Sequence, residues 1–319
     1  MVTFVSQSPL FSVVIPTYNR ANMLRQTLQS VFRQEYRDFE VFVVDDGSTE
    51  DQLPVIAEFR DRVTFLRQKN AGPGVARNRG AEAARGDYLA FLDSDDLWFP
   101  WTLTVLARFI QEHNRPAVLA GRLFEFLDEA ELLGIHQLAV QAASFTDYYA
   151  SSQRGYFVGA GASVLRREEF LKTGGFRSGF MNAEDHDLIM RMGAAAGFVQ
   201  VLSPVTIAWR RHANSATANF RRTYEGMRYL LRQERRHAYP GGRERLRDRR
   251  RILLTHLRPT ALSCVRHGLK REAWELYRVT YRWHLALGRW RFLLGFPLIA
   301  VLNPADRILF AGKQQPKSA

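Results

Sequence analysis

Three carboxylates stand within four residues, directly after a short apolar segment. Residues 89–92 (LAFL) form an apolar run that predicts a strand buried on both faces, and Asp93, Asp95 and Asp96 follow it. Ligands of open α/β sheets collect at the carboxyl ends of the strands. Carboxylates without Cys or His nearby favour hard cations such as Mg²⁺ or Mn²⁺. The spacing therefore predicts a metal site, and the alternative is a solvated Asp-rich turn in which Asp96 caps the next helix.

Two further apolar segments also end in polar residues. Tyr18 follows a predicted strand at 11–15, and Asp46 follows another at 39–44. An aromatic ring can stack on a nucleobase, and a carboxylate can accept the imide N–H of a uracil ring. The alternatives are a loop aromatic packed on the sheet edge for Tyr18 and a turn or helix-capping residue for Asp46.

A glycine-rich segment at 72–74 (GPG) opens a helix that we expect to run to about residue 84. With Arg77 and Arg79 in its first turns, it could bind anionic oxygens at a helix N-terminus. It matches neither a P-loop nor a dinucleotide-binding fingerprint. The alternative is an ordinary helix start with solvated arginines.

Another acidic cluster, residues 184–187 (EDHD), begins a predicted helix at 183–196. Counting from Asp185, apolar residues follow at i+3, i+4 and i+7, so we expect Asp185 to continue the buried face and Asp187 to point away. A carboxylate that faces inward at a helix start could act on a bound substrate. The alternative is that Asn182 caps the helix and Asp185 closes a capping box.

A histidine follows the last predicted strand, in the sequence Trp209 to His212 (WRRH). His212 is a candidate ligand for a metal ion or a phosphate. A solvated histidine in a basic loop is the alternative.

The segments between these motifs alternate strand and helix, which predicts a mostly parallel sheet with right-handed crossovers. We expect strands at 11–15, 39–44, 63–66, 89–92, 117–126, 157–165, 198–202 and 205–209. We expect helices at 22–32, 54–59, 72–84, 101–113, 145–150, 167–172 and 183–196. Beyond residue 219 the pattern is helical and Arg-rich, with four helices separated near 240–242, 267–268 and 288.

The composition is that of an ordinary globular protein, with 46% hydrophobic and 24% charged residues. The single cysteine, Cys264, excludes an internal disulfide and suits a reducing compartment. We see no secretory signal and no apolar run of the ~18 residues that span a bilayer. We therefore expect a cytoplasmic protein.

Charge is unevenly distributed along the chain. Residues 1–209 contain 20 Lys and Arg against 25 Asp and Glu, whereas residues 210–319 contain 25 against 7. The two parts carry −5 and +18, which gives the total of +13. We predict a catalytic domain at 1–217 and a basic helical region at 218–319.

Several of these stretches together resemble a family 2 glycosyltransferase with the GT-A fold. They are VVIPTYNR (13–20), VVDDGS (43–48), GPGVARNRG (72–80), YLAFLDSDD (88–96), GGF (174–176), EDHDL (184–188) and WRRHANSAT (209–217). They run in the family's order over roughly residues 10–217, two-thirds of the chain.

The resemblance implies a nucleotide site. The loop formed by Pro16, Thr17 and Tyr18, together with Asp46, would hold the base of the donor nucleotide. Arg77 would lie near the nucleotide.

The resemblance also implies a metal site and a catalytic base. Asp93 and Asp95 would form the DXD element, with Asp95 on the metal ion and Asp93 at the ribose or the metal. His212 would lie near the diphosphate or the metal. Asp185 would be the catalytic base of an inverting transfer, with Glu184 as a secondary or acceptor-side residue.

The activity implied is an inverting transfer, dependent on Mn²⁺ or Mg²⁺, of a sugar from a nucleotide-sugar donor. A UDP-sugar is favoured through Asp46, and the acceptor would be a glycan or lipid-linked glycan in surface polysaccharide biosynthesis. One rival is a nucleotidyltransferase, which would release pyrophosphate and have no use for Asp185. The other is a non-catalytic protein that binds nucleotide sugars.

The basic region at 218–319 lies outside the resemblance. Its aromatic residues interleave with arginines: Trp274, Tyr277, Tyr281, Trp283 and Trp290 with Arg271, Arg278, Arg282, Arg289 and Arg291. This pattern favours a helix that contacts an anionic membrane surface, which would make the protein peripheral on the inner face of the cell membrane. The alternative is a helical subdomain with a solvated arginine face. Nucleic acid is disfavoured because no recognition motif is present.

Overall fold

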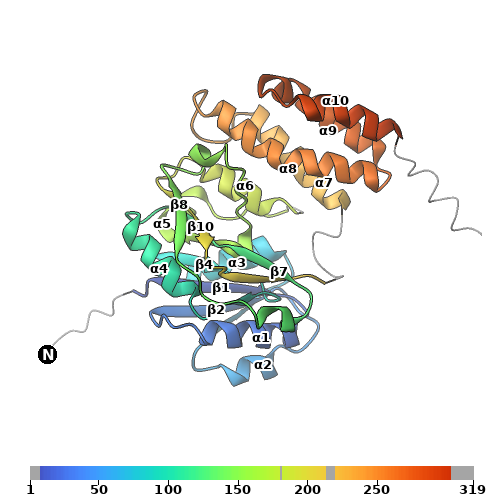
Figure 1. The fold of residues 1–319 in the computed structure, drawn as a ribbon. Helices are drawn as coiled ribbons and strands as arrows, with labels where there is room; N and C mark the ends of the chain where they lie inside the picture. Colours follow the sequence, from blue (N-terminus) through green and yellow to red (C-terminus); the bar gives the residue numbers. More distant parts are fainter. Residues whose placement is uncertain (1–7, 180–181, 213–219, 303–319) are drawn as a thin grey trace, which may run out of the picture. The chain divides into compact units, whose positions relative to one another are not determined.

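The chain divides into two compact units in the computed structural model, which describes residues 8–179, 182–212 and 220–302 (Figure 1). The first unit comprises Met1–Phe180 and Glu184–Ser215, and the second comprises Met181–Ala183 and Ala216–Ala319. The functional division into a catalytic domain at 1–217 and a basic region at 218–319 stays a prediction.

The first unit is built on an eight-stranded sheet with the order β3-β2-β1-β4-β9-β6-β10-β8. Its strands are β1 (Phe11–Thr17), β2 (Phe39–Asp45), β3 (Thr64–Arg67), β4 (Tyr88–Phe91), β6 (Val118–Ala120), β8 (Gln141–Phe145), β9 (Ser163–Arg166) and β10 (Phe198–Ser203). Strands β3, β2, β1 and β4 are parallel, and so are β6 and β10. Strand β9 is antiparallel to both of its neighbours, and β8 is antiparallel to β10. The predicted α/β class with a mostly parallel sheet is confirmed.

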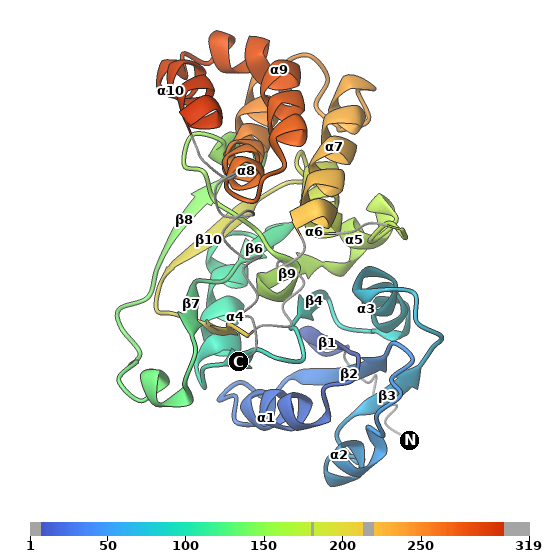
Figure 2. The same cartoon turned by 90° about the vertical axis from the view of Figure 1, so that its right-hand side faces the viewer.

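Helices cover both faces of this sheet (Figure 2). They are α1 (Ala21–Phe32), α2 (Leu53–Glu58), α3 (Pro73–Ala83), α4 (Thr102–Glu112), α5 (Arg167–Thr173) and α6 (Glu184–Arg191). On one face Val13 of β1 joins a single core cluster with Leu24 of α1 and Leu106 of α4. On the other face a Cβ at Gly80 of α3 would lie only 2.5 Å from Cγ1 of Val14. The central strands are mostly apolar because both of their faces are buried.

The segment 117–126, expected to be one strand, is two strands in different sheets. Gly121 and Arg122 separate β6 from β7 (Leu123–Phe126). Strand β7 joins β5 (Leu97–Trp98) and β11 (Ile207–Arg210) in a three-stranded sheet with the order β5-β11-β7. A Cβ at Gly121 would lie 2.7 Å from Thr206 Oγ1. The chain therefore changes sheets at a glycine, where its backbone passes too close to Thr206 for any side chain to fit.

Three other expected elements differ from the structure. Residues 145–150 are not a helix, since Phe145 ends edge strand β8 and only a 3₁₀ turn, η2 (Tyr149–Ser151), follows. The strand expected at 157–165 is reduced to β9, which the 3₁₀ turn η3 (Ala160–Ala162) precedes. Helix α6 ends at Arg191, before Gly193, where a Cβ would lie 2.2 Å from the ring of Tyr149.

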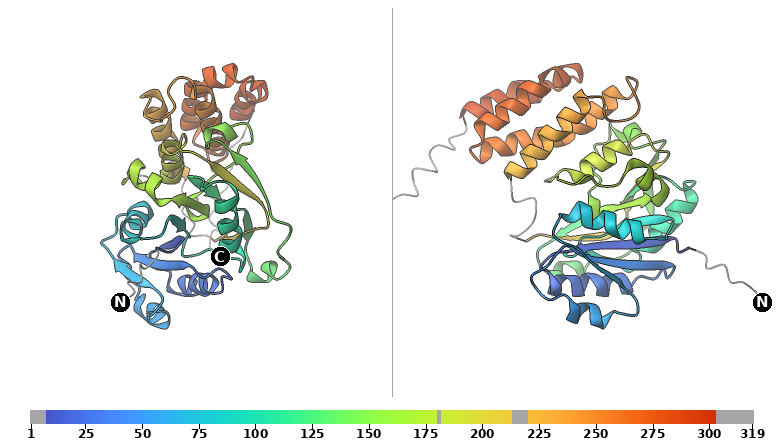
Figure 3. Two further views of the ribbon diagram at one scale, coloured as in Figure 1. Left: turned by 90° about the vertical axis from the view of Figure 1, so that its left-hand side faces the viewer. Right: turned by 180° about the vertical axis from the view of Figure 1, so that it is seen from behind.

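The second unit is helical, as predicted. Its described helices are α7 (Phe220–Arg235), α8 (Leu246–Arg266), α9 (Lys270–Ala286) and α10 (Trp290–Leu302). Helix α8 packs against α7 and α9, and α10 packs against α9 and α8 (Figure 3). Gly268 and Gly288 separate the last three helices with φ angles of 76° and 65°, which glycine adopts without strain. Within the described residues, no helix has the length and apolar character needed to cross a membrane.

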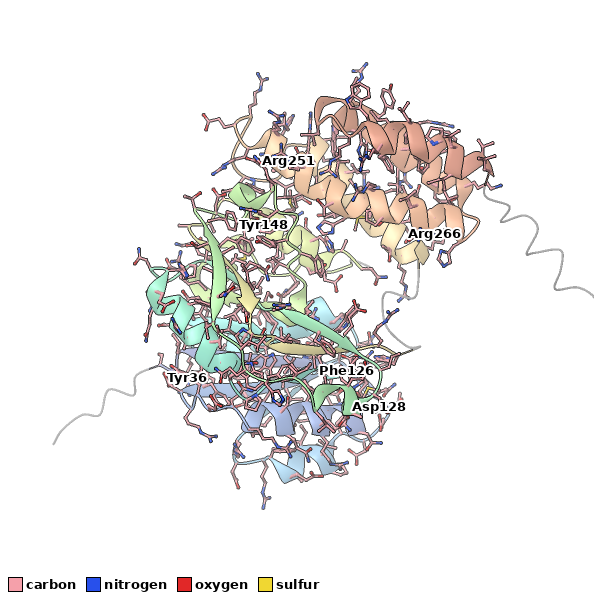
Figure 4. All side chains as sticks on the ribbon, in the orientation of Figure 1. Tyr36, Phe126, Asp128, Tyr148, Arg251 and Arg266 are labelled. Carbon is pink, nitrogen blue, oxygen red and sulfur yellow. The ribbon has the colours of Figure 1, made fainter. Side chains whose placement is uncertain are left out.

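A buried ion pair joins α7 to α8. Arg249 donates to both oxygens of Glu234, at 2.8 and 3.3 Å, and both side chains are 1% exposed. Arg249 also donates to the carbonyl oxygens of Pro240 and Gly242, so the segment between α7 and α8 supplies further acceptors for its guanidinium group. The other arginines of α8 include Arg251 and Arg266, near opposite ends of the helix (Figure 4).

Candidate functional site

The site lies at the carboxyl ends of β1, β2 and β4. Strand β1 pairs in parallel with β2 on one side and with β4 on the other. After β1 the chain therefore adds β2 and β3 on one side of β1, and then adds β4 on the opposite side. The loops after these strands diverge at such a switch point and leave room for a ligand. They contain the nucleotide and DXD residues predicted from the sequence.

Asp46, after β2, is buried and braces the loop that leads into α3. Its Oδ1 accepts hydrogen bonds from Gln68 Nε2 at 2.8 Å and from the Ala71 N–H at 2.9 Å, and its Oδ2 accepts from the Gly72 N–H at 2.8 Å. These bonds fix the backbone at the N-terminus of α3. The role of Asp46 toward a uracil ring stays a prediction. Oδ2 accepts only one of the hydrogen bonds given above, so its second lone pair would accept the N–H of the ring.

The predicted base-binding loop begins inside β1. Pro16 and Thr17 are buried as the last two residues of the strand, and Tyr18 is the first residue beyond it, with 45% of its surface exposed. Thr17 Oγ1 is buried and has no hydrogen-bond partner within the part of the chain that the structure describes. An exposed aromatic ring beside an unsatisfied hydroxyl is suited to bind a polar planar ligand.

Arg77 lies on the inner side of α3 and is 4% exposed. Its Nη2 donates to Asp93 Oδ1, and its Nη1 lies 3.9 Å from Glu184 Oε1. Burial would lower the pKa of Arg77, but the charges of Asp93, Glu184 and Asp185 raise it, so the guanidinium stays charged. The alternative of solvated arginines is wrong for this residue.

Asp95 is bound by an arginine and a histidine. Arg20 Nη1 donates to Asp95 Oδ2, and His212 Nε2 lies 2.8 Å from the same oxygen. The sequence left the environment of His212 open, and the structure brings it to the DXD loop. Sequence reasoning gave Arg20 no role, although Arg20 closes the motif VVIPTYNR.

Asp96 has a structural environment instead. Its Oδ1 accepts from the Arg210 N–H at 2.9 Å, and its backbone carbonyl accepts from Thr27 Oγ1 at 2.8 Å. Burial first, and then the charges of Asp93 and Asp95, raise the pKa of Asp96 well above its ordinary value. The proposed helix cap is wrong, because Asp96 is buried and ties the loop to β11 and α1.

The residues present fit a divalent ion that is shared with a substrate. Asp95 and His212 converge, and Asp93 comes from the same loop as Asp95. No group of three or more His, Cys, Asp or Glu side chains is arranged to hold a metal among the described residues. Mg²⁺ is commonly bound through one or two carboxylates together with substrate phosphates, and this partial ligand set suits that arrangement.

Asp185 is paired with the residue that follows it. Its Oδ1 accepts from the His186 N–H at 2.7 Å and lies 2.6 Å from His186 Nδ1. Burial would raise the pKa of Asp185, but the charge and hydrogen bonds of His186, and the charge of Arg77, hold it below its ordinary value. Burial would likewise lower the pKa of His186, but the charge of Asp185 and its hydrogen bond raise it. Sequence reasoning missed His186.

Asp187 is the acidic residue of this helix that the sequence placed wrongly. It was expected to point away, yet it is 0% exposed and accepts from Arg191 Nε at 2.8 Å. Arg191 also donates to the carbonyl oxygens of Thr173 and Gly175. A partner at i+4 neutralises the buried carboxylate, and the pair joins the end of α5 to α6.

The segment from Gly159 to Gly161 brings the DXD loop and Asp185 together. A Cβ at Gly161 would lie 2.7 Å from Asp93 Oδ2, and a Cβ at Gly159 would lie 3.9 Å from Asp185 Oδ2. Backbone without side chains therefore runs past both carboxylates. The sequence signal was the repeat of small residues in VGAGAS, to which sequence reasoning gave no role.

The family model described as glycosyl transferase family 2 matches residues 12–175, just over half of the chain. The chain belongs to this family. Its match starts in β1 and ends after α5, so it includes the loops predicted to bind the nucleotide, Arg77 and the predicted DXD element.

Curated relatives match over shorter segments. An uncharacterized glycosyltransferase of Rickettsia conorii is 42% identical over 105 residues, which are 32% of this chain and 17% of the relative. The poly(ribitol-phosphate) beta-N-acetylglucosaminyltransferase TarS of Staphylococcus aureus is 37% identical over 34% of this chain and 20% of its own. The succinoglycan biosynthesis protein ExoW of Rhizobium meliloti is 49% identical over 28% of this chain and 30% of its own. The matched segments thus span less than a third of each of these relatives.

Solved structures show that this family 2 member has the GT-A fold. Residues 1–349 of S. aureus TarS, in complex with UDP-GlcNAc, superpose with a TM-score of 0.59 at 20% identity, covering 85% of this chain and 91% of that one. The mannosyltransferase PcManGT of Pyrobaculum calidifontis, in complex with GDP-Man and Mn²⁺, gives a TM-score of 0.57 at 18% identity, covering 93% and 87%.

Proposed function

We propose that this protein is an inverting glycosyltransferase. It moves a sugar from a nucleotide-sugar donor, with a UDP-sugar favoured, to a glycan or lipid-linked acceptor in surface polysaccharide biosynthesis. The observation that carries the proposal is the approach of the segment 159–161 to both Asp93 and Asp185, with Arg77 paired to Asp93. The names of TarS and ExoW support a role in surface glycans.

Arg77 and His212 would stabilise the leaving group. Negative charge grows on the diphosphate as its bond to the sugar breaks, and donors already fixed in place lower the cost of that charge. Arg77 and His212 are held beside the DXD carboxylates and could supply this stabilisation. A divalent ion held by Asp95, Asp93 and His212 together with the diphosphate would neutralise more of the charge.

Asp185 would act as the base. An acceptor hydroxyl is a poor nucleophile until a positioned carboxylate takes its proton. Oδ1 of Asp185 is engaged by His186, and a Cβ at Gly159 would lie 3.9 Å from Oδ2. One base is sufficient for a single displacement, which inverts the configuration at the sugar carbon. Retention by double displacement would need a carboxylate nucleophile as well.

A panel of nucleotide sugars with Mn²⁺ or Mg²⁺ tests the proposal, with and without lipid-linked acceptors. We expect release of a nucleoside diphosphate that depends on both the metal ion and the acceptor. Release of pyrophosphate would instead support a nucleotidyltransferase. Donor binding with no turnover for any acceptor would support a non-catalytic binding protein.

We also propose that the reaction takes place on the inner face of the cell membrane, where a lipid-linked acceptor would be available. The charge of +18 on residues 210–319 supports this location.

A further inference from the structure

Apart from the exposed Arg291, helix α10 has no charged side chain, and among the described residues only one of its sides is buried. Phe292, Leu293, Phe296 and Ala300 form its buried side. The opposite side is a ridge of apolar residues that are 45% to 74% exposed: Trp290, Leu294, Leu298, Ile299, Val301 and Leu302. A helix that is hydrophobic all round is normally buried in a core or in lipid.

The buried side of α10 is held firmly, so the ridge is fixed outward. The ring of Phe296 stacks on Tyr277 of α9 with 4.7 Å between centroids, and Phe292 lies 4.3 Å from the ring of His284. Tyr277 Oη also donates to the carbonyl oxygen of Leu293 at 2.9 Å. Turning the ridge inward would break these contacts.

Tyr277 also lines a pocket of about 450 Å³. The remaining lining residues are Arg235, Arg278, Val279, Tyr281 and Arg282. Among the described residues, three arginines and no acidic residue line the pocket. Guanidinium groups bind phosphate oxygens in a planar, bidentate geometry. Tyr277 lines the pocket and also contacts the buried side of α10, so the pocket and the helix that carries the ridge share a contact within the helical unit.

We propose that the ridge of α10 and this arginine pocket form a docking surface for an anionic phospholipid membrane. The ridge inserts among the acyl chains in the plane of the interface, and the pocket binds a lipid phosphate. Aromatic residues and long arginine side chains suit this boundary, since each has an apolar part and a polar end. The inference rests on the proposed membrane location and names the residues that produce it.

A second copy of this chain is the main alternative occupant of the ridge. A symmetric contact through α10 would bring together two copies of a basic region, because residues 210–319 carry a net charge of +18. Juxtaposed like charges oppose association, whereas an anionic lipid surface attracts them. Charge complementarity therefore favours lipid.

The test uses the full-length protein and vesicles, and it measures binding instead of sugar transfer. We expect sedimentation with vesicles of phosphatidylglycerol and phosphatidylcholine at low salt, and much weaker sedimentation with phosphatidylcholine alone. Leu294→Glu/Leu298→Glu should weaken binding at least tenfold. Leu133→Glu/Leu138→Glu is the matched control, because these leucines are 82% and 66% exposed in the first unit, and it should bind like the wild type.

A second pair of variants tests the pocket. Arg278→Gln/Arg282→Gln should weaken binding by about tenfold or more, since each basic residue near an anionic surface contributes about 1 kcal/mol. Arg33→Gln/Arg60→Gln removes the same charge from exposed sites in the first unit and should have little effect. Raising the salt from about 0.1 M to 1 M should weaken binding without abolishing it, because the apolar part is not screened.

Three results would overturn the proposal. One is no sedimentation of the wild type with anionic vesicles at low salt. Another is a Leu294→Glu/Leu298→Glu variant that binds as well as the wild type. The third is a concentration-dependent dimer of the wild type that this variant abolishes, which would assign the ridge to a second copy. Transfer activity can be present or absent in each case, so failure here is distinguishable from failure of the proposed function.

Discussion

The candidate site of the first unit and the arginine pocket of the second unit place arginine in opposite environments. In the first unit Arg77 and Arg191 are buried against carboxylates at strand ends and helix starts. In the second unit Arg278 and Arg282 line an open pocket. Arg249 is an exception, because it is buried and paired with Glu234. Buried pairs fix geometry, because a charge left alone in the interior is costly, whereas exposed arginines attract an anionic partner at little cost in stability.

This comparison predicts where substitutions will act. Changes to buried pairs should affect folding or the chemistry of the site. Changes to the exposed arginines and leucines of the second unit should affect binding and leave both folding and the chemical step intact.

The largest effect on stability is expected at the buried pair of the second unit. Glu234→Ala leaves Arg249 charged and unpaired, and we expect a loss of about 3 to 5 kcal/mol in the free energy of unfolding, measured with denaturant. Glu234→Leu/Arg249→Met removes both charges and should recover much of that loss. If Glu234→Ala is as stable as the wild type, the buried pair of Glu234 and Arg249 does not stabilise the second unit.

The largest effect on activity is expected at Asp95. Asp95→Asn keeps the shape of the side chain and loses its charge, so metal-dependent turnover should fall about 10³-fold, in line with several kcal/mol of charge stabilisation. Release of nucleoside diphosphate, with and without EDTA, measures this. Asp96→Asn is the matched control, because the amide oxygen can still accept from the Arg210 N–H, and it should retain most of its activity. Full activity of Asp95→Asn, or equal activity in EDTA, would remove the metal from the mechanism.

Asp185→Asn should still bind the donor but transfer about 10²-fold more slowly or worse, which is the usual contribution of a general base. Calorimetric donor binding and transfer kinetics separate the two effects. A variant as fast as the wild type would assign the base to another residue. Glu184 is then the next candidate, since Asp187 is buried against Arg191.

The smallest effect is expected at His186. His186→Gln removes a charged hydrogen bond to Asp185 and should cost about 1.5 to 3 kcal/mol of stability. The pKa of His186 is raised above 6.5, so the contribution of the pair is complete below that pH and is lost as the pH rises through the folded-state value. The pKa of Asp185 is lowered from 3.8, so the contribution is also lost as the pH falls through the folded-state value. Unfolding from pH 4 to 9 should show the largest difference between variant and wild type below about pH 6.5. A difference that does not change with pH would mean that the pair is not ionic.

The sequence predicted the central strands well because they are buried on both faces. Strands such as β1 and β4 are mostly apolar and fully buried, and a group of polar residues follows each of them. The small sheet of β5, β11 and β7 was missed for the opposite reason. Strand β5 has only two residues, and it pairs with residues about 110 positions later in the chain, so no local pattern marks it.

The candidate site was predicted in part for the same reason. Strand ends located the carboxylates, because the edge of a parallel sheet brings them together. The partners of those carboxylates could not be read from spacing. Arg77 stands 16 residues before Asp93 and His212 stands 117 residues after Asp95, and only the tertiary structure brings each pair together.

The central claim is a single displacement with one carboxylate base at the switch point. The configuration of the product linkage, determined by NMR on the product made from a defined nucleotide sugar, tests it most directly. We predict that the anomeric configuration of the transferred sugar is opposite to that in the donor. A product that retains the donor configuration would contradict the mechanism, because retention by double displacement requires a nucleophilic carboxylate that this account does not include.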